Sequence, residues 1–376
     1  MRRLWILLLF SMLLFQAASS AAPLKSNPLI AFSSDRAGSR IPDIYVMNQD
    51  GSDQRALTVR TEKGVTIHLG AVAPVWSPDG KKLAFVTPTD NLPNLYVISA
   101  DGSDLRRLAR NANNPTWSPD SEQIAFEKYM LQSKASGFAR SSLYVVNADG
   151  SDQRLLTRGP ARVSGGVRAP AWSPVGERIA FGTVRYTQKG FIYDDIYVVN
   201  TSGGGQRNLT RGSSSDYPPA WSPDGKSIAF IRGPHPSVNS FVEESFTAKN
   251  IYVMNADGGP LRLLTTQATI QVDAEHPTLS LAWRPDGKEI AYVAGATDAF
   301  YQREIWIVNV VGHERRLLPR RGNHPTWSPD SKRVAFVSVP PVPFNTEIYV
   351  MNADGGGQTR LTQNRAWDSY PAWQPR

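Results

Sequence analysis

The stretch PVWSPDGKKLAFVTPTDNLPNLYVISADGSDLRRLA, from Pro74 to Ala109, decides the fold. It contains four short runs rich in β-branched, aromatic and aliphatic residues. Residues typical of turns separate these runs, so each run predicts a β-strand. Ser-Pro-Asp-Gly joins the first run to the second, and Ala-Asp-Gly joins the third to the fourth, and both are sequences of tight hairpin turns. The stretch therefore predicts one four-stranded antiparallel sheet.

The same unit recurs along the chain in a fixed order, which is the strongest signal in the sequence. Its four parts are Pro-x-Trp, Ile-Ala-Phe, Ile-Tyr-Val-x-Asn and Arg-x-Leu-Thr, each with near variants. Each part occurs seven times, and Leu281–Trp283 is the copy of the first part that lacks proline. The aromatic residues of the third part lie between 43 residues apart (Trp306 to Tyr349) and 55 residues apart (Tyr197 to Tyr252). A four-stranded unit at this period predicts the blade of a β-propeller.

The order of the parts at the two ends of the repeated region predicts how the ring closes. The repeats open at the second part, Ile30–Phe32, and stop just after the first part, Pro371–Trp373. The last strand would then complete the first blade and leave no unpaired blade edge. We therefore predict an all-β fold, a seven-bladed β-propeller of four-stranded antiparallel blades over residues 28–376, with the ring closed by the C-terminal strand. Ser121 and Ser331 replace the glycine of Ser-Pro-Asp-Gly in two repeats, so we expect strain in those turns.

Residues 1–22 have the pattern of an export signal. Two arginines precede an apolar run from Trp5 to Phe15, and the small residues that follow allow cleavage after Ala21 or Ala22. The run is short for a bilayer span, and the alternatives are an uncleaved anchor or a buried helix. No later segment is long and apolar enough to span a membrane, and the absence of cysteine excludes disulfides and thiolate chemistry. We therefore expect a monomer in the periplasm or outside the cell.

The charge balance gives only a mild preference for partners. The formal net charge of +8 falls to about +6 once the two arginines of the signal are removed. This slightly favours anionic surfaces or ligands. No run of like charges resembles a nucleic-acid-binding arm, so we predict no nucleic-acid partner.

The repeated unit resembles the WD40-like (PD40) repeat of the TolB propeller family. In the first repeat, Ser34–Arg36 and Asp43–Asn48 carry the resemblance, which extends from about residue 28 to the C-terminus. The resemblance implies a periplasmic protein that binds partners of the cell envelope and has no catalytic activity. We expect two differences from that family. The separate N-terminal domain that precedes the TolB propeller would be missing, because the repeats begin almost at the predicted cleavage site. We also count seven repeats, whereas the TolB propeller has six blades. Similar repeats also occur beside peptidase domains and in carbohydrate-acting propellers.

The connections between strands divide the predicted ring into two faces. Short, uniform turns join the first strand to the second and the third to the fourth, and they emerge on what we call the short-turn face. Longer connections emerge on the opposite side, which we call the long-loop face; they include Val59–Ala73, Glu127–Ser141 and Gly182–Asp194. Long loops on a rigid scaffold often carry binding function, and these combine aromatic with basic residues as protein interfaces do. The contact residues predicted there are Arg185, Tyr186, Phe191, Tyr193 and Trp367.

A second set of candidate residues precedes the Pro-x-Trp strands and should lie near the mouth of the central channel. The set comprises Asn114, Arg168, Tyr217, His276, His324 and Tyr370. His276 and His324 could meet there beside Asp216 or Asp368. The alternative is that these residues only line a water-filled channel, and that the loop aromatics only pack on the rim. The five histidines include no His-x-His pair, so we predict no metal site and no cofactor.

Other chemistry has little support in the sequence. It contains no Gly-x-Ser-x-Gly nucleophile elbow and no nucleotide-binding glycine loop, so we assign no catalytic residue. Asp-Gly-Ser-Asp, which begins at Asp50, Asp101 and Asp149, lacks the spacing of a calcium loop and predicts a hairpin turn. We therefore predict an exported, non-catalytic propeller that binds a cell-envelope protein, peptide or glycan through its long-loop face. The alternatives are a carbohydrate-active lyase or hydrolase with its site at the channel mouth, and a structural spacer.

Overall fold

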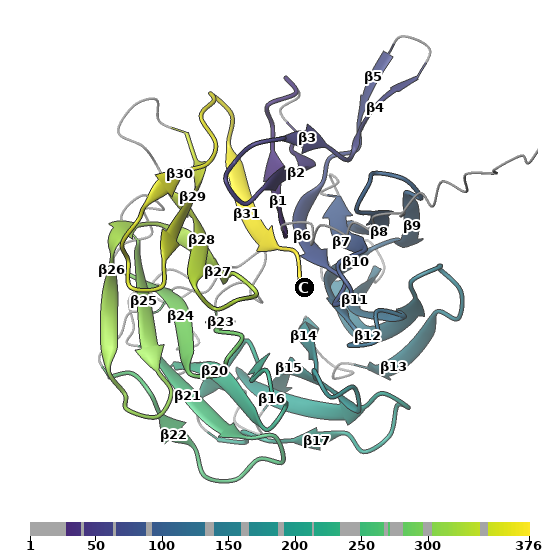
Figure 1. Ribbon diagram of the computed structural model, residues 1–376. Helices are drawn as coiled ribbons and strands as arrows, with labels where there is room; N and C mark the ends of the chain where they lie inside the picture. The colour runs from purple at the N-terminus through teal and green to yellow at the C-terminus, as the bar shows by residue number, and fades with distance from the viewer. Residues whose placement is uncertain are drawn as a thin grey trace, which may run out of the picture.

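The structure is a computed structural model that describes residues 28–38, 41–62, 65–87, 92–131, 139–158, 165–186, 192–212, 214–233, 249–266, 270, 281–295, 303–338 and 345–376. Within these ranges every regular element is a β-strand. None of the described segments forms a helix long and apolar enough to cross a membrane. An all-β propeller is confirmed, because the strands form sheets that follow one another around a central axis (Figure 1).

The sheets succeed one another around the ring in chain order, beginning with the one that holds both ends of the repeated region. This first sheet contains, from its outer to its inner edge, β3 (Arg55–Ala56), β2 (Asp43–Asn48), β1 (Leu29–Ser34) and β31 (Asp368–Trp373). A two-stranded ribbon follows, with β4 (Val59–Glu62) and β5 (Val65–His68). The next sheet contains β6 (Val72–Trp76), β7 (Lys82–Thr87), β8 (Asn94–Ser99) and β9 (Arg106–Ala109). An eight-stranded sheet contains β10 (Ala112–Trp117), β11 (Gln123–Leu131), β12 (Ala139–Asn147), β13 (Arg154–Arg158), β14 (Gly165–Trp172), β15 (Arg178–Tyr186), β16 (Ile192–Asn200) and β17 (Arg207–Asn208).

Three sheets complete the ring. A five-stranded sheet contains β18 (Ser215–Asp216), β19 (Ala220–Trp221), β20 (Ser227–Gly233), β21 (Asn250–Asn255) and β22 (Arg262–Leu263). A four-stranded sheet contains β23 (Leu281–Trp283), β24 (Glu289–Ala294), β25 (Glu304–Asn309) and β26 (Arg315–Arg321). The last contains β27 (Asn323–Trp327), β28 (Arg333–Ser338), β29 (Glu347–Asn352) and β30 (Thr359–Arg360).

The prediction of seven separate four-stranded blades is wrong. In the described part of the chain, five sheets of four or five strands stand as separate blades, and a continuous eight-stranded sheet occupies the sector between β9 and β18. That sheet is continuous because Ser141 of β12 pairs in parallel with Gly166 of β14. A Cβ at Gly166 would lie 2.2 Å from the backbone oxygen of Ser141, so only glycine permits this approach.

The core lies between neighbouring sheets, where a phenylalanine and a tyrosine repeatedly face each other across two strands. Phe85 of β7 lies opposite Tyr96 of β8, and their rings stack with centroids 5.7 Å apart. Phe126 and Tyr144 repeat the pair in the next sheet at 6.0 Å. The phenylalanines are fully buried and the tyrosines half-buried. Such offset aromatic pairs add stability beyond the area that they bury, which explains why the two aromatic patterns repeat together.

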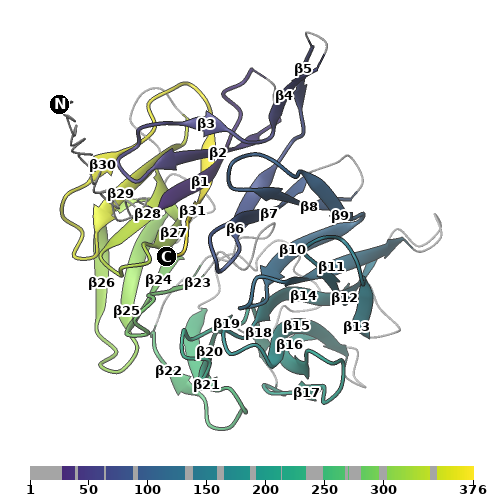
Figure 2. The same cartoon turned by 45° about the vertical axis from the view of Figure 1, so that its right-hand side comes forward.

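The predicted closure of the ring is confirmed by the pairing of β31 with β1. Ile30 lies opposite Trp373 and Ala31 lies opposite Ala372 in an antiparallel register. Figure 2 shows β31, in yellow, beside β1, in purple. The first sheet is thus built from strands at opposite ends of the repeated region, and its inner edge is covered by the last strand.

The structure bears out the two strained turns and corrects three of the predicted loops. Ser121 and Ser331 have φ angles of 65° and 62°, the left-handed region that non-glycine residues rarely adopt. The described residues of the ranges Glu127–Ser141 and Gly182–Asp194 are strand, because β11, β12, β15 and β16 each extend for nine residues. Val59–Ala73 contains the β4–β5 ribbon, which projects from the ring (Figure 1).

Candidate functional site

A backbone distortion recurs on the innermost strands and includes three of the candidate residues, Asn114, His324 and Tyr370. On five of the Pro-x-Trp strands, the residue before the proline has a positive φ angle. These residues are Ala73 (52°), Asn114 (49°), Ala169 (45°), His324 (51°) and Tyr370 (53°). The register of these strands shifts at the same place, as expected for a β-bulge. Bulges redirect side chains and are common beside functional sites. The side chain of the residue before proline therefore does not follow the regular alternation of side chains between the two faces of the strand.

A buried carboxylate lies at the centre of a polar cluster that joins three strands. Glu127 of β11 is 2% exposed, and its Oε1 accepts hydrogen bonds from Asn114 Nδ2 at 2.8 Å and from the backbone N–H of Ala169 at 2.5 Å. The hydroxyl of Tyr129 donates to Oε2 at 3.0 Å. Burial raises the pKa of Glu127, against the opposing effect of the hydrogen bonds from Ala169, Asn114 and Tyr129. Glu127 therefore joins β10, β11 and β14 through one side chain.

Arg168 lies beside this carboxylate and reaches toward solvent. Its guanidinium is 3.6 Å from Asp194 Oδ1, and its side chain is 43% exposed. Arg168 also interacts electrostatically with Tyr217, Glu127 and Tyr129. Burial raises the pKa of Asp194 more than Arg168 lowers it. The cluster therefore combines one partly exposed cation with two carboxylates and two phenols.

The position of Tyr217 depends on a glycine in the neighbouring strand. A Cβ at Gly182 of β15 would lie 2.9 Å from Tyr217 Cδ2, closer than real contacts allow. The absence of a side chain at Gly182 therefore makes room for the Tyr217 ring. Burial raises the pKa of the Tyr217 phenol well above its usual range, so the phenol stays protonated and can donate a hydrogen bond.

The structure brings together Asn114, Arg168 and Tyr217 of the predicted set, and it pairs His324 with Tyr370 elsewhere on the ring. The rings of His324 and Tyr370 have centroids 4.5 Å apart. His276 lies outside the described residues, so its predicted approach to His324 stays a prediction. Each carboxylate named as their possible partner is bonded to an arginine, Asp216 to Arg232 and Asp368 to Arg36. The described residues contain no group of three potential ligands suited to a metal ion.

The remaining predicted contacts have different outcomes. Trp367 is 56% exposed, as a contact residue requires. Arg185 of β15 faces Tyr193 of β16 in the strand register, and Tyr186 follows in β15, but the described structure gives only their backbone. Phe191 lies outside the described residues. Binding by any of these residues stays a prediction.

The turn interpretation of Asp-Gly-Ser-Asp agrees with the observed hydrogen bonds. Asp50 Oδ1 accepts bonds from the backbone N–H of Ser52 at 3.0 Å and from its hydroxyl at 2.6 Å. The same pair of contacts joins Asp101 to Ser103. One oxygen of each of these carboxylates is thus engaged within its own turn.

The comparison with protein families confirms the resemblance seen in the sequence. The family model described as the TolB beta propeller domain matches residues 62–162 and 268–376, more than half of the chain. The chain belongs to the TolB beta propeller domain family. Membership in this family fits a binding role.

The TolB relatives match only a part of their own length. The Tol-Pal system protein TolB of Anaeromyxobacter dehalogenans is 38% identical over 126 residues, which are 33% of this chain and 26% of that protein. The chain thus spans about a quarter of the length of the curated relatives that it matches first.

Solved structures show the same fold in enzymes. A puromycin-hydrolyzing peptidase of Mycobacterium tuberculosis is 14% identical with a TM-score of 0.61, and the match covers 86% of this chain and 50% of that one. An oligogalacturonate lyase in complex with manganese is 17% identical with a TM-score of 0.56, covering 77% of this chain and 76% of that one. At these identities the similarity shows the fold alone.

Sequence reasoning missed Glu127, Tyr129 and Asp194 as members of the cluster. A signal for Glu127 was present in the repeat. In four other repeats the residue after Ile-Ala-Phe or its variant is apolar: Val86, Ile231, Val293 or Val337. Glu127 is the one acidic residue at this position of the repeat. A charged residue at a repeated apolar strand position requires buried partners. Gly182 occupies the same position in the following repeat, where it makes room for Tyr217.

Proposed function

We propose that this chain is an exported, non-catalytic propeller that binds a cell-envelope protein, peptide or glycan through its long-loop face, with Arg168 at the centre of the contact. The observation that carries the proposal is the partly exposed guanidinium of Arg168 beside the buried Glu127. Its distance from Asp194, 3.6 Å, exceeds hydrogen-bond length. The guanidinium can therefore offer N–H donors to an acceptor of a partner, such as a carboxylate or a sugar oxygen.

The large apolar side chains left exposed on this face support the same proposal. Among the described residues these are Ile41, Ile67, Met130 and Trp367. Tryptophan and arginine are among the residues most enriched in binding hot spots. The family relationship supports a location in the periplasm or outside the cell, and the proposal assumes that the protein acts there as a monomer.

The experiment measures which envelope components bind to the wild-type protein and to variants of its long-loop face. Purified wild type, Arg168→Met and Trp367→Ala are immobilised, exposed to envelope extract of the source bacterium, and the bound proteins and glycans are identified by mass spectrometry. Arg168→Met removes the charge while keeping the length of the side chain. Arg107→Glu is the control, because Arg107 is exposed on β9, an outer strand.

The proposal predicts components that wild type and Arg107→Glu retain and that Arg168→Met and Trp367→Ala lose, with all four proteins melting within about 2 °C of one another. Arg168→Lys should recover part of the binding, since lysine restores the positive charge but lacks the planar guanidinium group that donates two parallel hydrogen bonds. Equal retention by wild type and Arg168→Met would show that the long-loop face is not centred on Arg168.

A second candidate is a carbohydrate-active enzyme that uses the same cluster. The favouring observation is Asp194, a carboxyl with a raised pKa beside Arg168 and Tyr217, because a general acid requires a raised pKa. Oligogalacturonate and other envelope and plant glycans would be incubated with the protein, with and without manganese, and unsaturated or shortened products measured. Product formation that Asp194→Asn abolishes would favour the enzyme over the binding protein.

A further inference from the structure

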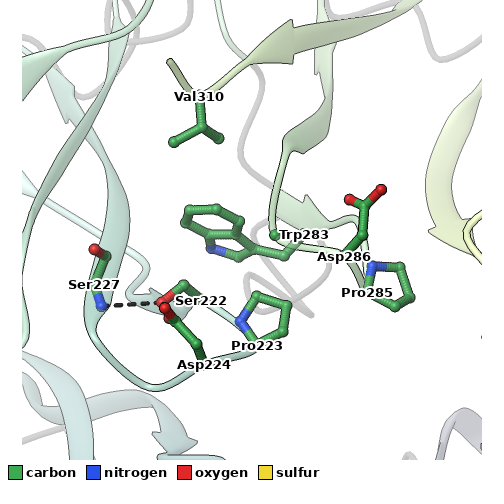
Figure 3. A pocket seen from close by; sticks show the side chains of 9 residues that line it. Ser222, Pro223, Asp224, Ser227, Trp283, Pro285, Asp286 and Val310 are labelled. Carbon is green, nitrogen blue, oxygen red and sulfur yellow. Dashed lines mark hydrogen bonds between the residues drawn. The ribbon is translucent and has the colours of Figure 1, made fainter.

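A pocket lies on the short-turn face between two neighbouring blades, and none of its lining residues belongs to the cluster just described. It has a volume of about 390 Å³ and is bounded by the β19–β20 turn, the β23–β24 turn and Val310. Figure 3 shows the indole of Trp283 at its centre, with Val310 on one side and Pro223 on the other. Asp224 and Asp286 also line the pocket. An aromatic face is thus combined with two carboxylates in one hollow.

At the pocket, Trp283 is more exposed than the tryptophans at the same position of the other repeats. Six tryptophans at the equivalent position are between 5% and 8% exposed. Trp283 is only partly buried and packs at the margin of its hydrophobic cluster. The side chain that the preceding blade places beside Trp283 also differs from its counterpart in two other blades.

In three other places an arginine of the preceding sheet covers the repeated tryptophan. The guanidinium of Arg178 lies 5.6 Å from the ring centroid of Trp221, and that of Arg333 lies 5.1 Å from the ring of Trp373. Arg284 lies 5.2 Å from the ring of Trp327. These distances are those of cation–π contacts, and tryptophan is the best aromatic partner for them.

At the pocket, a serine takes the place of the covering arginine. Arg178, Ser227 and Arg333 are equivalent in the strand register, since each lies opposite the asparagine that ends the following strand. The hydroxymethyl group of Ser227 is too short to reach across the indole of Trp283. The volume filled by a guanidinium in two other blades is therefore open at this position.

The charge of the pocket is opposite to that of the missing group. Asp224 accepts bonds from the Ser222 hydroxyl at 2.6 Å and from the backbone N–H of Lys226 at 3.1 Å, and these bonds lower its pKa, so it is ionised at neutral pH. Asp286 is 3.3 Å from Arg284. The side chains of Lys226, Lys288 and Arg284 lie outside the pocket lining.

We infer that this pocket binds an arginine side chain of a partner protein or peptide, whose guanidinium stacks on Trp283 as Arg178 stacks on Trp221. The aliphatic part of the arginine would pack on Pro223 and Val310, as long basic side chains do on apolar surface. Its N–H groups would donate to the carboxylates of Asp224 and Asp286. Arginine fits better than lysine because its planar group both stacks and donates in several directions.

The experiment measures peptide binding at the Trp283 indole by nuclear magnetic resonance of the intact protein. Acetyl-glycyl-arginyl-glycinamide is titrated while the indole N–H resonance of Trp283, assigned by its loss in Trp283→Phe, is followed. Peptides with lysine or citrulline in place of arginine are titrated in the same way. Lysine keeps the charge without the planar group, and citrulline keeps the planar group without the charge.

The arginine peptide should shift the resonance saturably and bind about tenfold or more tightly than either analogue. Ser227→Arg should abolish the shift, because it fills the pocket from within the chain, as Arg178 and Arg333 do in other blades. Ser202→Arg is the matched control: it adds the same charge to an exposed turn of the same face and should leave binding within about twofold of wild type.

Three results would overturn the inference. They are the absence of a saturable shift up to millimolar peptide, equal binding of the lysine or citrulline peptide, and undiminished binding to Ser227→Arg. Neither variant touches Arg168 or the long-loop face, so the outcome is independent of the proposed function.

Discussion

The indole Nε1 of Trp76 donates a hydrogen bond at 3.0 Å to the backbone oxygen of Ala372, across the junction at which the ring closes. The same bond joins Trp117 to Val75 and Trp327 to Ala282, from each tryptophan to the middle residue of the preceding Pro-x-Trp strand. The closure is therefore made by the same contact that joins other neighbouring sheets. It needs no special device, because β31 supplies the inner strand that the first sheet lacks.

Replacing Trp76 by phenylalanine should destabilise the protein more than the same change at Trp373. Both indoles are 6% exposed, but Nε1 of Trp373 has no hydrogen-bond partner in the described structure. Trp76→Phe leaves the Ala372 oxygen without its donor, which costs about 1 kcal/mol beyond the lost apolar area. Urea unfolding of both variants measures the difference. Equal losses would mean that the indole bond contributes nothing to closure.

Ser331→Gly should stabilise the protein by about 0.5–1 kcal/mol, because glycine adopts a φ of 62° without steric cost. Gly80→Ser should do the reverse. Gly80 has a φ of 68°, and a Cβ there would lie 3.1 Å from Gln374 Cγ. Thermal unfolding of the two variants, monitored by circular dichroism, gives shifts of opposite sign. A lower melting temperature for Ser331→Gly would contradict the strain assigned to that turn.

Thr362→Val should destabilise the protein by about 2 kcal/mol. Thr362 Oγ1 accepts a bond from the backbone N–H of Ile348 at 2.9 Å and donates one to Glu347 at 2.5 Å, and all three residues are buried. Valine keeps the shape but leaves a buried donor and a buried carboxylate oxygen short of a partner. Thr66→Val, on the exposed side of β5, is the control and should change the free energy of unfolding by less than about 0.5 kcal/mol.

The stability of wild type should decline more steeply with rising pH than that of Glu127→Gln. The pKa of Glu127 is raised by burial in the folded protein, so the folded state binds more protons than the unfolded state does. Its contribution is therefore complete below the unfolded pKa of about 4.3 and is lost as pH rises from there through the folded pKa. Glutamine imitates the protonated form and removes this dependence. Urea unfolding between pH 4.5 and 8, at about half-unit steps, tests the slope.

A control with the opposite sign is available on the surface. Hydrogen bonds from Ser103 lower the pKa of Asp101, so Asp101 stabilises the folded state above its unfolded pKa and loses this effect as pH falls. Asp101→Asn should therefore leave the decline at high pH unchanged. Identical slopes for wild type and Glu127→Gln would show that Glu127 does not titrate in this way.

Gly182→Ala should displace the Tyr217 ring and disturb the site around Arg168. The new Cβ would lie 2.9 Å from Tyr217 Cδ2, and relief of such overpacking typically costs about 1–3 kcal/mol. Gly204→Ala is the matched control, because no atom lies within 4 Å of its Cβ position. Melting temperature and the retention of envelope components are measured together. Wild-type binding by Gly182→Ala would separate Tyr217 from the binding surface.

Much of the fold could be predicted from the repeats because their signals are local. Asp-Gly and Pro-Asp-Gly turns and alternating aromatic residues identify the hairpins wherever they occur. The prediction failed where neighbouring repeats interact. The parallel pairing of Ser141 with Gly166 creates the eight-stranded sheet, and nothing in either hairpin alone indicates it. The nine-residue strands β11 and β12 likewise turned a predicted loop into part of a sheet.

The candidate site was predicted only in part for the same reason. Asn114, Arg168 and Tyr217 were identified from their positions before Pro-x-Trp strands, which the repeat fixes. Glu127 and Asp194 lie on other strands, and they belong to the site only because of the contacts that folding creates. Asn114 and Ala169 donate buried hydrogen bonds to Glu127, and Arg168 lies beside Asp194. The pKa of a carboxyl depends on these surroundings more than on its neighbours in sequence.

The sequence by itself determined that this protein is a ring of antiparallel hairpins closed by its own last strand, because strand and turn propensities act within a few residues. The tertiary structure alone decided which sheets merge, which carboxylates are buried beside Arg168 and which tryptophan is left uncovered. Those features arise between repeats. A glycine at 166 or 182, or a serine at 227, has its effect only on the backbone or ring that packing brings within a few ångströms.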